Sequence, residues 1–464
     1  MASALLMTGC STQPPTPPTV PDAATAIART VSIIRSATAE QPRVLKVLFY
    51  GQSISSPRWT DQAMAALRAK YPDVAFDVHN LALGGWSADL LERAVQRDID
   101  EVYPDLIVFH VYGDQHAYER IIQAFRSRTA ADIIVQTDHV VAPVEPLCDQ
   151  GIHLRWSPPP GCKGHIRFKQ NVWEDYMSGL WIPTMAAKYE LAVEPRRKRW
   201  DDYLKANRLA PGALIADSPH PNVRGWTLMA NLFTSWFESV VGGGATAKPK
   251  FPDAVRSFAP PAPGASQRYE FTGNRIEILA AGPLEGKVTV TIDGKAPQDL
   301  DGCWQDSRVS RLPNISDWPA LKQVSVSSAY HKADTWTLRV TGLNAAQDAF
   351  DFTLSSASGG PDGSGKAGAT FVSPSGRVTI EPGDWNLAYA RHVAGKGVAD
   401  GATFQWQRRF VCTDQPAVAL PNGATEQRHV LATGLANGRH VVELTVAADA
   451  PALSELRAYQ PPWQ

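Results

Sequence analysis

The stretch VLKVLFYGQSISS (residues 44–56) joins an apolar run to a glycine and a cluster of serines. Residues 44–50 are apolar at nearly every position, which is typical of a strand buried on both faces of a parallel sheet. A strand that stops at Gly51 precedes either an ordinary strand-to-helix turn or a turn that presents Ser53 as a nucleophile. One serine does not decide between them, so the partners of Ser53 must come from other loops.

The same pattern continues through residues 23–240, where short apolar runs alternate with helical patterns. Strands are predicted at 44–50, 74–83, 105–112, 131–138 and 191–195, and helices at 60–71, 87–103, 117–129, about 168–190, about 198–207 and after Asn222. The alternation predicts a doubly wound α/β domain in which helices cover both faces of a parallel sheet. Functional residues of such domains lie in loops beyond the carboxyl ends of the strands.

The pattern changes after residue 240. Residues 241–265 are rich in Gly, Ala and Pro, which predicts a linker. Residues 266–464 contain short alternating strands with Gly-rich turns, which predict an all-β, jelly-roll-like sandwich domain, either one sandwich with insertions or two smaller ones. This domain is expected to bind carbohydrate, to brace the first domain or to cover part of its cleft, and its Gly-rich segment 360–368 is predicted to be an exposed loop.

Composition limits the classes of partner. The chain has 464 residues, 44% of them hydrophobic, and a formal net charge of -1, which gives no reason to expect a nucleic-acid partner. No apolar run reaches the roughly 20 residues of a membrane span. No Walker loop, G-x-G-x-x-G turn or zinc-spaced Cys/His cluster is present, so we expect neither a cofactor nor a metal, and no protein partner is predicted.

The first 22 residues resemble the end of a bacterial lipoprotein signal followed by a Pro-rich tether. Leu5 to Cys10 resembles a lipobox, although no basic segment precedes it, so we expect the true start to lie upstream. A lipidated Cys10 would make the chain an exported lipoprotein of the periplasm, outer membrane or cell surface, held to the membrane only by its lipid. The alternative is a disordered start with a stray cysteine.

The other four cysteines fit an oxidising compartment. Cys148 and Cys162 would close a short loop within the first domain, and Cys303 and Cys412 both fall in the C-terminal half. Two disulfides agree with export, and free buried thiols are the alternative.

Three further loops carry residues that suit ester hydrolysis by a serine. They are residues 80–87, 110–115 and 217–222, each placed at the end of a strand or before the last helix. Serine catalysis needs a base, a carboxylate that orients the base, and donors for the developing oxyanion. Ser53, His220, Asp217 and glycine amides would supply these groups.

These residues resemble the SGNH (GDSL-type) serine hydrolase and esterase family over about residues 43–240. Gly51-Gln52-Ser53-Ile54 is similar to its first block, G-D-S-L/I, with Gln in place of Asp. Gly85, five positions after Asn80, resembles the glycine of the second block, and Asp217-x-x-His220 resembles the last block, D-x-x-H. The resemblance implies a three-layer α/β/α, flavodoxin-like domain with Ser53 as nucleophile, His220 as base and Asp217 as its orienting carboxylate.

The resemblance also implies an oxyanion hole formed by the amides of Ser53 and Gly85 and an Asn side chain of the third block. Asp114 stands at that Asn position, and an ionised carboxylate cannot donate a hydrogen bond. Three readings stay open: Asp114 is protonated through burial, it contributes its backbone N–H while Gln115 supplies the side-chain donor, or the site is weakened or specialised.

Other residues near the motifs have two readings each. Arg58, Trp59 and Trp86 would contact a sugar or pack the loops, and His116 or His110 would line the substrate pocket or serve structure. Asp138, at the end of a predicted strand, would enter the site or bond within a turn.

The function expected from the resemblance is that of an exported serine esterase. It would remove acyl groups, most simply O-acetyl, from a polysaccharide or oligosaccharide through an acyl-Ser53 intermediate. The alternatives are a lipid or thioester hydrolase with an apolar acyl groove, an O-acetyltransferase, and a non-catalytic glycan-binding surface lipoprotein with a degenerate site.

Overall fold

The computed structural model describes residues 18–142, 170–243, 248–313, 315 and 317–463. The lipidation prediction for Cys10 and the disulfide prediction for Cys148 and Cys162 lie outside these residues. Among the described helices, none has both the length and the apolar character needed to cross a membrane.

The first part of the chain folds into a parallel five-stranded sheet, in the order β2-β1-β3-β4-β5. The strands are β1 (Arg43–Gly51), β2 (Val74–Asn80), β3 (Leu106–His110), β4 (Asp132–Gln136) and β5 (Ala192–Glu194). This is the flavodoxin-like strand order, and it confirms the predicted α/β class. Strand order reverses beside β1, so its carboxyl end, at Gly51, is where a site is expected in such a sheet.

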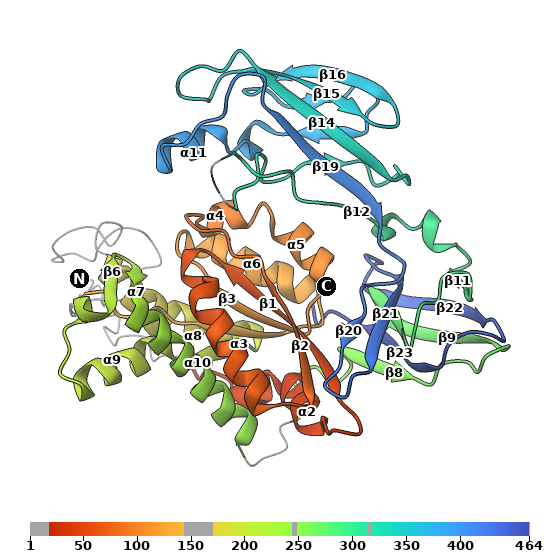
Figure 1. Cartoon of the computed structure of the whole chain (residues 1–464), viewed down its shortest axis with the longest axis horizontal. Coiled ribbons are helices and arrows are strands. Elements are labelled where there is room, and N and C mark those ends of the chain that lie inside the picture. The colour runs from red at the N-terminus through yellow and green to blue at the C-terminus, as the bar shows by residue number, and fades with distance from the viewer. Residues whose placement is uncertain (1–17, 143–169, 244–247, 314, 316, 464) are drawn as a thin grey trace, which may run out of the picture.

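Helices cover both faces of this sheet (Figure 1). One face packs against α1 (Ala23–Ala26), α2 (Ala28–Ser36), α3 (Pro57–Lys70), α9 (Arg196–Ala206) and α10 (Val223–Gly242). The other packs against α4 (Ala88–Leu91), α5 (Val95–Val102), α6 (Gln115–Arg128), α7 (Gln170–Tyr176) and α8 (Ile182–Tyr189), with a π-helical turn at Met177–Trp181 between the last two. Strand β1 is buried along almost its whole length, as its apolar run requires.

The C-terminal half forms two β units, a sandwich and a second unit inserted into its chain. The first, here called the sandwich, has sheets of order β20-β21-β10-β23-β8 and β11-β22-β9. Its strands are β8 (Val255–Phe258), β9 (Ser266–Gly273), β10 (Arg275–Ala280), β11 (Val288–Ile292), β20 (Val418–Ala419), β21 (Thr425–Ala432), β22 (Gly438–Val446) and β23 (Leu453–Tyr459). Helix α10 and strand β8 both enter the predicted linker 241–265, so that segment is only partly a connection.

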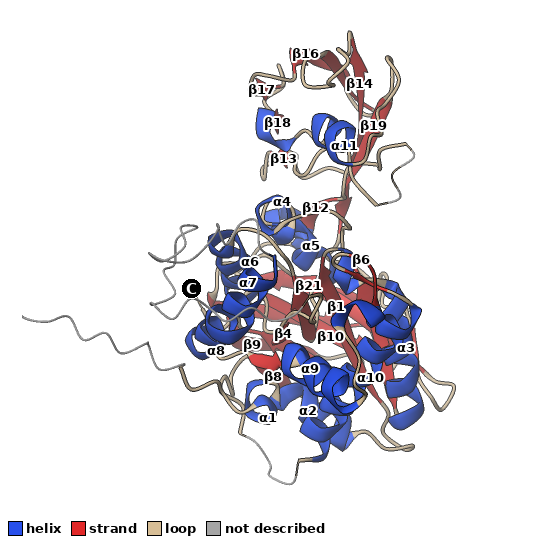
Figure 2. Ribbon diagram, turned by 90° about the vertical axis from the view of Figure 1, so that its left-hand side faces the viewer, coloured by secondary structure: helices blue, strands red, loops and turns tan. Residues whose placement is uncertain are grey.

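The second unit, here called the inserted unit, is residues 304–410, placed in the chain between β11 and β20. Its sheets have the orders β12-β19-β14-β15-β16 and β13-β18-β17. The elements are β12 (Trp304–Asp306), β13 (Ser325–Val326), β14 (Asp334–Thr341), β15 (Asp351–Ser356), β16 (Gly360–Lys366), β17 (Phe371–Val372), β18 (Val378–Ile380), α11 (Leu387–Val393) and β19 (Thr403–Phe410). The inserted unit stands over α4 of the α/β domain (Figure 2). The segment 360–368 predicted as a loop is largely strand β16.

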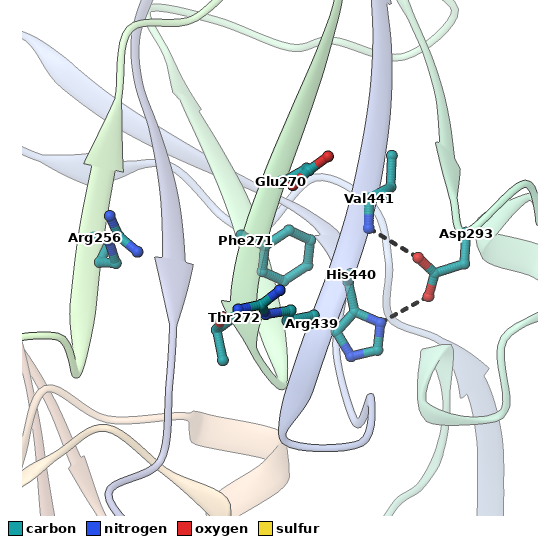
Figure 3. Close-up of a pocket in the computed structure, with 8 residues that line it drawn as sticks. All are labelled: Arg256, Glu270, Phe271, Thr272, Asp293, Arg439, His440 and Val441. Atoms are coloured by element: carbon teal, nitrogen blue, oxygen red, sulfur yellow. Dashed lines mark hydrogen bonds and ion pairs between the residues drawn. The ribbon is translucent and has the colours of Figure 1, made fainter.

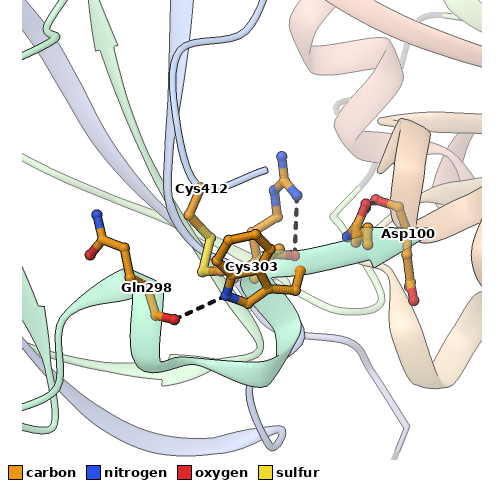
Figure 4. Close-up of a disulfide and its surroundings, with 8 residues drawn as sticks. Asp100, Gln298, Cys303 and Cys412 are labelled. Atoms are coloured by element: carbon orange, nitrogen blue, oxygen red, sulfur yellow. Dashed lines mark hydrogen bonds between the residues drawn. A yellow bond between two sulfur atoms is a disulfide. The ribbon is translucent and has the colours of Figure 1, made fainter. Parts of the chain in front are cut away.

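A disulfide closes the base of the inserted unit. Cys303 and Cys412 are bonded with Cα atoms 5.1 Å apart, directly before β12 and soon after β19 (Figure 4). Strands β12 and β19 pair there, Trp304 opposite Phe410. The predicted oxidation of this cysteine pair is therefore confirmed, and the bond ties the two ends of the insertion together.

Buried charges join the β units to the α/β domain. Arg308 of the inserted unit lies 2.7 Å from Asp98, and Arg428 of the sandwich lies 3.6 Å from Asp105. Burial raises the pKa of Asp98, but the guanidinium groups of Arg308 and Arg97 outweigh it and hold that pKa below its usual range. Arg97 also binds Asp98 at 3.0 Å, and Arg29 binds Asp105 at 2.9 Å, so each buried carboxylate is shared between the α/β domain and a β unit.

Candidate active site

Ser53 lies in the turn that follows β1. Gly51 has φ +151°, and a Cβ there would lie 1.9 Å from the carbonyl oxygen of His110 on the neighbouring strand. Only glycine permits that approach, after which the chain enters a short 3₁₀ turn, Ser53–Ser55. The glycine therefore ends the strand and places Ser53 at the rim of the sheet.

His220 and Asp217 meet Ser53 in the arrangement of a catalytic triad. His220 Nε2 lies 2.8 Å from Ser53 Oγ, and His220 Nδ1 lies 2.5 Å from Asp217 Oδ1. Both residues come from a two-stranded hairpin, β6 (Ile215–Asp217) and β7 (His220–Pro221), just before α10. Because the Asp carboxylate accepts the Nδ1 proton, Nε2 is left free to take a proton from the serine hydroxyl.

His139 holds the hairpin that carries Asp217 and His220, through the backbone of Pro219. This fully buried side chain donates from Nε2 to the carbonyl oxygen of Pro219 at 2.7 Å. Burial lowers the pKa of His139 to about 3, against the opposing effect of the Pro219 hydrogen bond, so the ring is neutral at ordinary pH. His139 thus fixes the backbone beside His220 without adding a charge to the site. The sequence motifs did not indicate this residue.

The backbone amides of Ser53 and Gly85 are the candidates to bind an oxyanion. Within the described part of the chain, neither Ser53 N–H nor Gly85 N–H donates a hydrogen bond. A Cβ placed on Gly84 would lie 3.7 Å from Ser53 Cβ, so the peptide that joins Gly84 to Gly85 passes beside the serine. Both amides predicted for the oxyanion hole therefore come from segments at the site.

Asp114 has a different role from the predicted one. Its carboxylate caps α6 and accepts the N–H of Ala117 at 2.7 Å. Neither Asp114 nor the buried Gln115 is among the described residues that line the cavity at Ser53. The carboxylate is already engaged as the acceptor that caps α6 and does not line the cavity, so the structure does not support Asp114 as an oxyanion donor.

A cavity of about 380 Å³ opens at Ser53. Its described lining is Gln52, Ser53, Ser56, Pro57, Arg58, Ala82, Gly84, Ala216, Asp217, His220, Pro221, Trp226 and Asp317. Arg58, predicted to contact substrate, is exposed on this rim. Asp317 comes from the inserted unit, so two parts of the chain far apart in sequence form one cavity.

Three other residues predicted for substrate contact are not in that lining. Trp59 and Trp86 are fully buried, and Trp59 donates its indole N–H to Ile54 O at 2.6 Å while packing on Phe49. His116 is exposed, and its ring meets the edge of Trp181 at 5.8 Å. The two tryptophans therefore pack the core, which corrects their assignment.

His110 and Asp138 form a buried pair instead of joining the triad. His110 Nε2 lies 2.8 Å from Asp138 Oδ1, and both side chains are almost fully buried at the ends of β3 and β4. Among the described residues, no group of three or more His, Cys, Asp or Glu side chains has the arrangement of a metal site. The chemistry available at the cavity is that of the serine, histidine and aspartate.

A second cavity, of about 430 Å³, lies on the sandwich (Figure 3). Its histidine, His440, is bonded to Asp293 at 2.7 Å and to Ala436 O at 2.8 Å. The residues that line it include Arg256, Arg439 and Phe271 but neither serine nor cysteine. Among its described lining residues, no hydroxyl or thiol contacts the histidine as Ser53 contacts His220 in the first cavity.

No protein-family model matches the chain, and no curated protein matches it. Solved structures of low similarity include the acetyl xylan esterase AlAXEase, at 17% identity, over 41% of this chain and 99% of that one, with a TM-score of 0.33. Axe2, an acetylxylan esterase from Geobacillus stearothermophilus, matches at 16% identity over 44% of this chain and 96% of its own, with a TM-score of 0.32.

A two-domain esterase active on acetylated mannans, co-crystallised with mannopentaose, matches over nearly the whole chain. It is 11% identical and covers 95% of this chain and 96% of its own, with a TM-score of 0.34. Matches at these identities and TM-scores do not by themselves assign an activity to the present chain.

Proposed function

We propose that the chain is an SGNH-type serine esterase that removes short acyl groups, most simply acetyl, from an acylated carbohydrate. The observation that carries the proposal is the contact of Ser53 Oγ with His220 Nε2 at 2.8 Å, with Asp217 on the opposite ring nitrogen. Gly51 ahead of the serine, and the Gly85 amide, which donates to no acceptor among the described residues, supply the remaining parts that acyl transfer needs.

In the proposed reaction, His220 takes the proton of Ser53 as Oγ bonds to the ester carbon. The carbonyl oxygen becomes an oxyanion held by the amides of Ser53 and Gly85. The carbon–oxygen bond to the sugar then breaks, and the alcohol leaves with the proton from His220. Water adds to the acyl-Ser53 ester in the same way and releases the acid, with no metal or cofactor in the proposed steps.

The cavity favours a short acyl group on a polar alcohol. Its rim carries the charged side chains Arg58, Asp217 and Asp317, and its volume is about 380 Å³. A lipid or long-chain thioester hydrolase needs an extended apolar groove for the acyl chain, whereas Trp226 is the only large hydrophobic side chain in the described lining. Sugar hydroxyls suit such a polar rim.

Export is part of the proposal. The Cys303–Cys412 disulfide supports an oxidising compartment, because cytosolic thiols are kept reduced. A lipid on Cys10 is tested separately by mass spectrometry of the protein isolated from its host.

The test is the rate of hydrolysis of a p-nitrophenyl ester series from acetyl to long chains, followed by acetate release from acetylated xylan and acetylated mannan. The proposal expects the acetyl ester to be cleaved fastest and acetate to be released from at least one glycan. Faster cleavage of long chains would favour the lipid hydrolase. No cleavage of any ester, with retained binding to a glycan, would favour the non-catalytic lipoprotein.

A further inference from the structure

The peptide between Gly84 and Gly85 has to be held in one orientation for the proposed oxyanion hole to exist. In a planar trans peptide, the carbonyl of Gly84 and the N–H of Gly85 point in opposite directions. Glycine on both sides removes the Cβ contacts that would otherwise restrict rotation of this peptide, and Gly85 has φ +79°. Whatever fixes the carbonyl of Gly84 therefore also fixes the direction of the Gly85 N–H.

Two side chains of the inserted unit bind the carbonyls at this point. Trp318 Nε1 donates to Gly84 O at 2.5 Å, and Tyr389 Oη donates to Gly85 O at 2.7 Å. Their rings stack on each other with centroids 5.1 Å apart and planes inclined by 22°. Trp318 is almost completely buried, so its N–H has exchanged water for this one acceptor.

The indole also packs directly against the glycine. A Cβ placed on Gly85 would lie 2.8 Å from Trp318 Cζ2, closer than a side chain and a ring can approach. The ring therefore occupies the space on one side of the peptide while its N–H holds the Gly84 oxygen. A flip of this peptide would break the hydrogen bond from Trp318 and turn the Gly85 N–H to the opposite side.

We propose that Trp318 and Tyr389 are positioning residues for the oxyanion hole, so that the inserted unit is a working part of the active site. The inference rests on the esterase function proposed above. It also accounts for a hole without a side-chain donor from Asp114: two backbone amides suffice when one of them is held rigidly in place.

Other contacts hold the inserted unit against the α/β domain. Arg93 binds both carboxylate oxygens of Asp384 at 2.9 Å, and Arg97 donates to Lys322 O at 3.1 Å. These contacts involve α4–α5 and leave the glycine pair untouched. Loss of the Trp318 hydrogen bond alone should therefore leave the inserted unit in place while the peptide becomes free to rotate.

The test compares Tyr389→Phe, which keeps the ring and removes its O–H donor, with Trp318→Phe, which keeps an aromatic side chain but removes the indole N–H and part of the ring that packs on Gly85. Trp304→Phe is the matched control, because it removes an indole N–H of the same unit that donates to Gln298 O at 2.9 Å. We expect kcat for p-nitrophenyl acetate to fall about fivefold or more in each variant. Loss of one hydrogen bond changes the equilibrium between the two orientations of the Gly84–Gly85 peptide by about that factor. The double variant should approach the loss of about 10²–10³ seen when an oxyanion donor is removed.

KM should change little in these variants, since the oxyanion forms only in the transition state. A purely structural role would instead alter stability or KM and leave kcat unchanged. A kcat within twofold of wild type in the double variant, with the Trp304→Phe control also unchanged, would overturn the inference while leaving the esterase function intact.

A second readout separates failure of the inference from failure of the proposed function. If wild type hydrolyses no ester, the crystal structures of wild type and the double variant still report the Gly84–Gly85 peptide. A flipped or doubly occupied peptide in the variant alone supports the positioning role. The same single orientation in both proteins overturns it.

Discussion

Acid should weaken the fold beneath the triad, because His139 is buried in its neutral form. The ring donates to Pro219 O at 2.7 Å, its Nδ1 has no partner among the described atoms, and Arg196 and Arg197 lie nearby. Protonation would place a cation in a dry site beside two guanidinium groups. The unfolded chain takes up that proton easily, so lowering the pH favours unfolding.

The magnitude follows from the two pKa values. With an unfolded pKa of 6.5 and a folded pKa of about 3, the unfolded state binds more protons throughout that interval. The contribution of His139 to stability is fully present above pH 6.5 and is lost as pH falls toward 3. Between about pH 7.5 and pH 5 the loss comes to about 2 kcal/mol by linkage.

The assay is urea unfolding of wild type and His139→Gln at those two pH values, followed by fluorescence and circular dichroism. Gln keeps an N–H donor for Pro219 but does not titrate, so the variant should lose about 2 kcal/mol less between the two pH values than wild type. His116→Gln, at an exposed histidine, is the control and should behave like wild type. Equal pH dependence of the free energy of unfolding in His139→Gln and wild type would refute the reasoning.

Three further outcomes are expected. Asp217→Asn should lower kcat for p-nitrophenyl acetate about a hundredfold. The loss is smaller than for a buried triad carboxylate because the Asp217 side chain is 76% exposed. An unchanged kcat would remove Asp217 from the triad. Asp317→Ala should raise KM for an acetylated oligosaccharide and leave p-nitrophenyl acetate hydrolysis unchanged, because Asp317 lines the rim of the cavity at Ser53. Equal effects on both substrates would contradict a sugar contact. Cys303→Ser with Cys412→Ser should lower the free energy of unfolding by roughly 3–5 kcal/mol, because the bond closes a loop with a sequence separation of 109. A loss near zero in urea unfolding would mean that the pairing of β12 with β19 is enough to hold the two ends of the inserted unit together.

Local pattern was enough for the α/β domain and the triad. The apolar run before Gly51 and the alternation of strands and helices are set by burial, which sequence records directly. Ser53 and the Asp217–His220 pair were found because each motif sits where a parallel sheet places its loops. Helix 87–103 was predicted whole but is α4 and α5, because a turn at residues 92–94 interrupts it.

The role of Asp114 was misread by a shift of two residues. The helix was predicted to begin at 117, whereas α6 begins at Gln115, directly after the Asp. An Asp before a helix is a recognised N-cap signal, and it would have identified the carboxylate as an acceptor. Trp59 and Trp86 were ambiguous for another reason: a tryptophan beside a site packs or binds according to tertiary contacts that the local sequence does not show.

The contribution of the inserted unit could not be predicted from local sequence. Trp318 and Gly84 are 234 residues apart, and Tyr389 and Gly85 are 304 apart. The Gly-rich segment 360–368 was predicted as a loop, yet in β16 the absence of a side chain at Gly365 leaves room for the rings of Phe352 and Phe371. Such features depend on how whole units meet, and one sequence carries no signal for them.

The most direct test of the central claim is the rate of acetate release by wild type, Ser53→Ala and Ser55→Ala. Ser55 is a buried neighbour outside the described cavity lining, so it is the matched control. The account predicts that Ser53→Ala falls to the uncatalysed background while Ser55→Ala stays near wild type. Activity retained by Ser53→Ala would contradict the serine-esterase account, whatever the substrate.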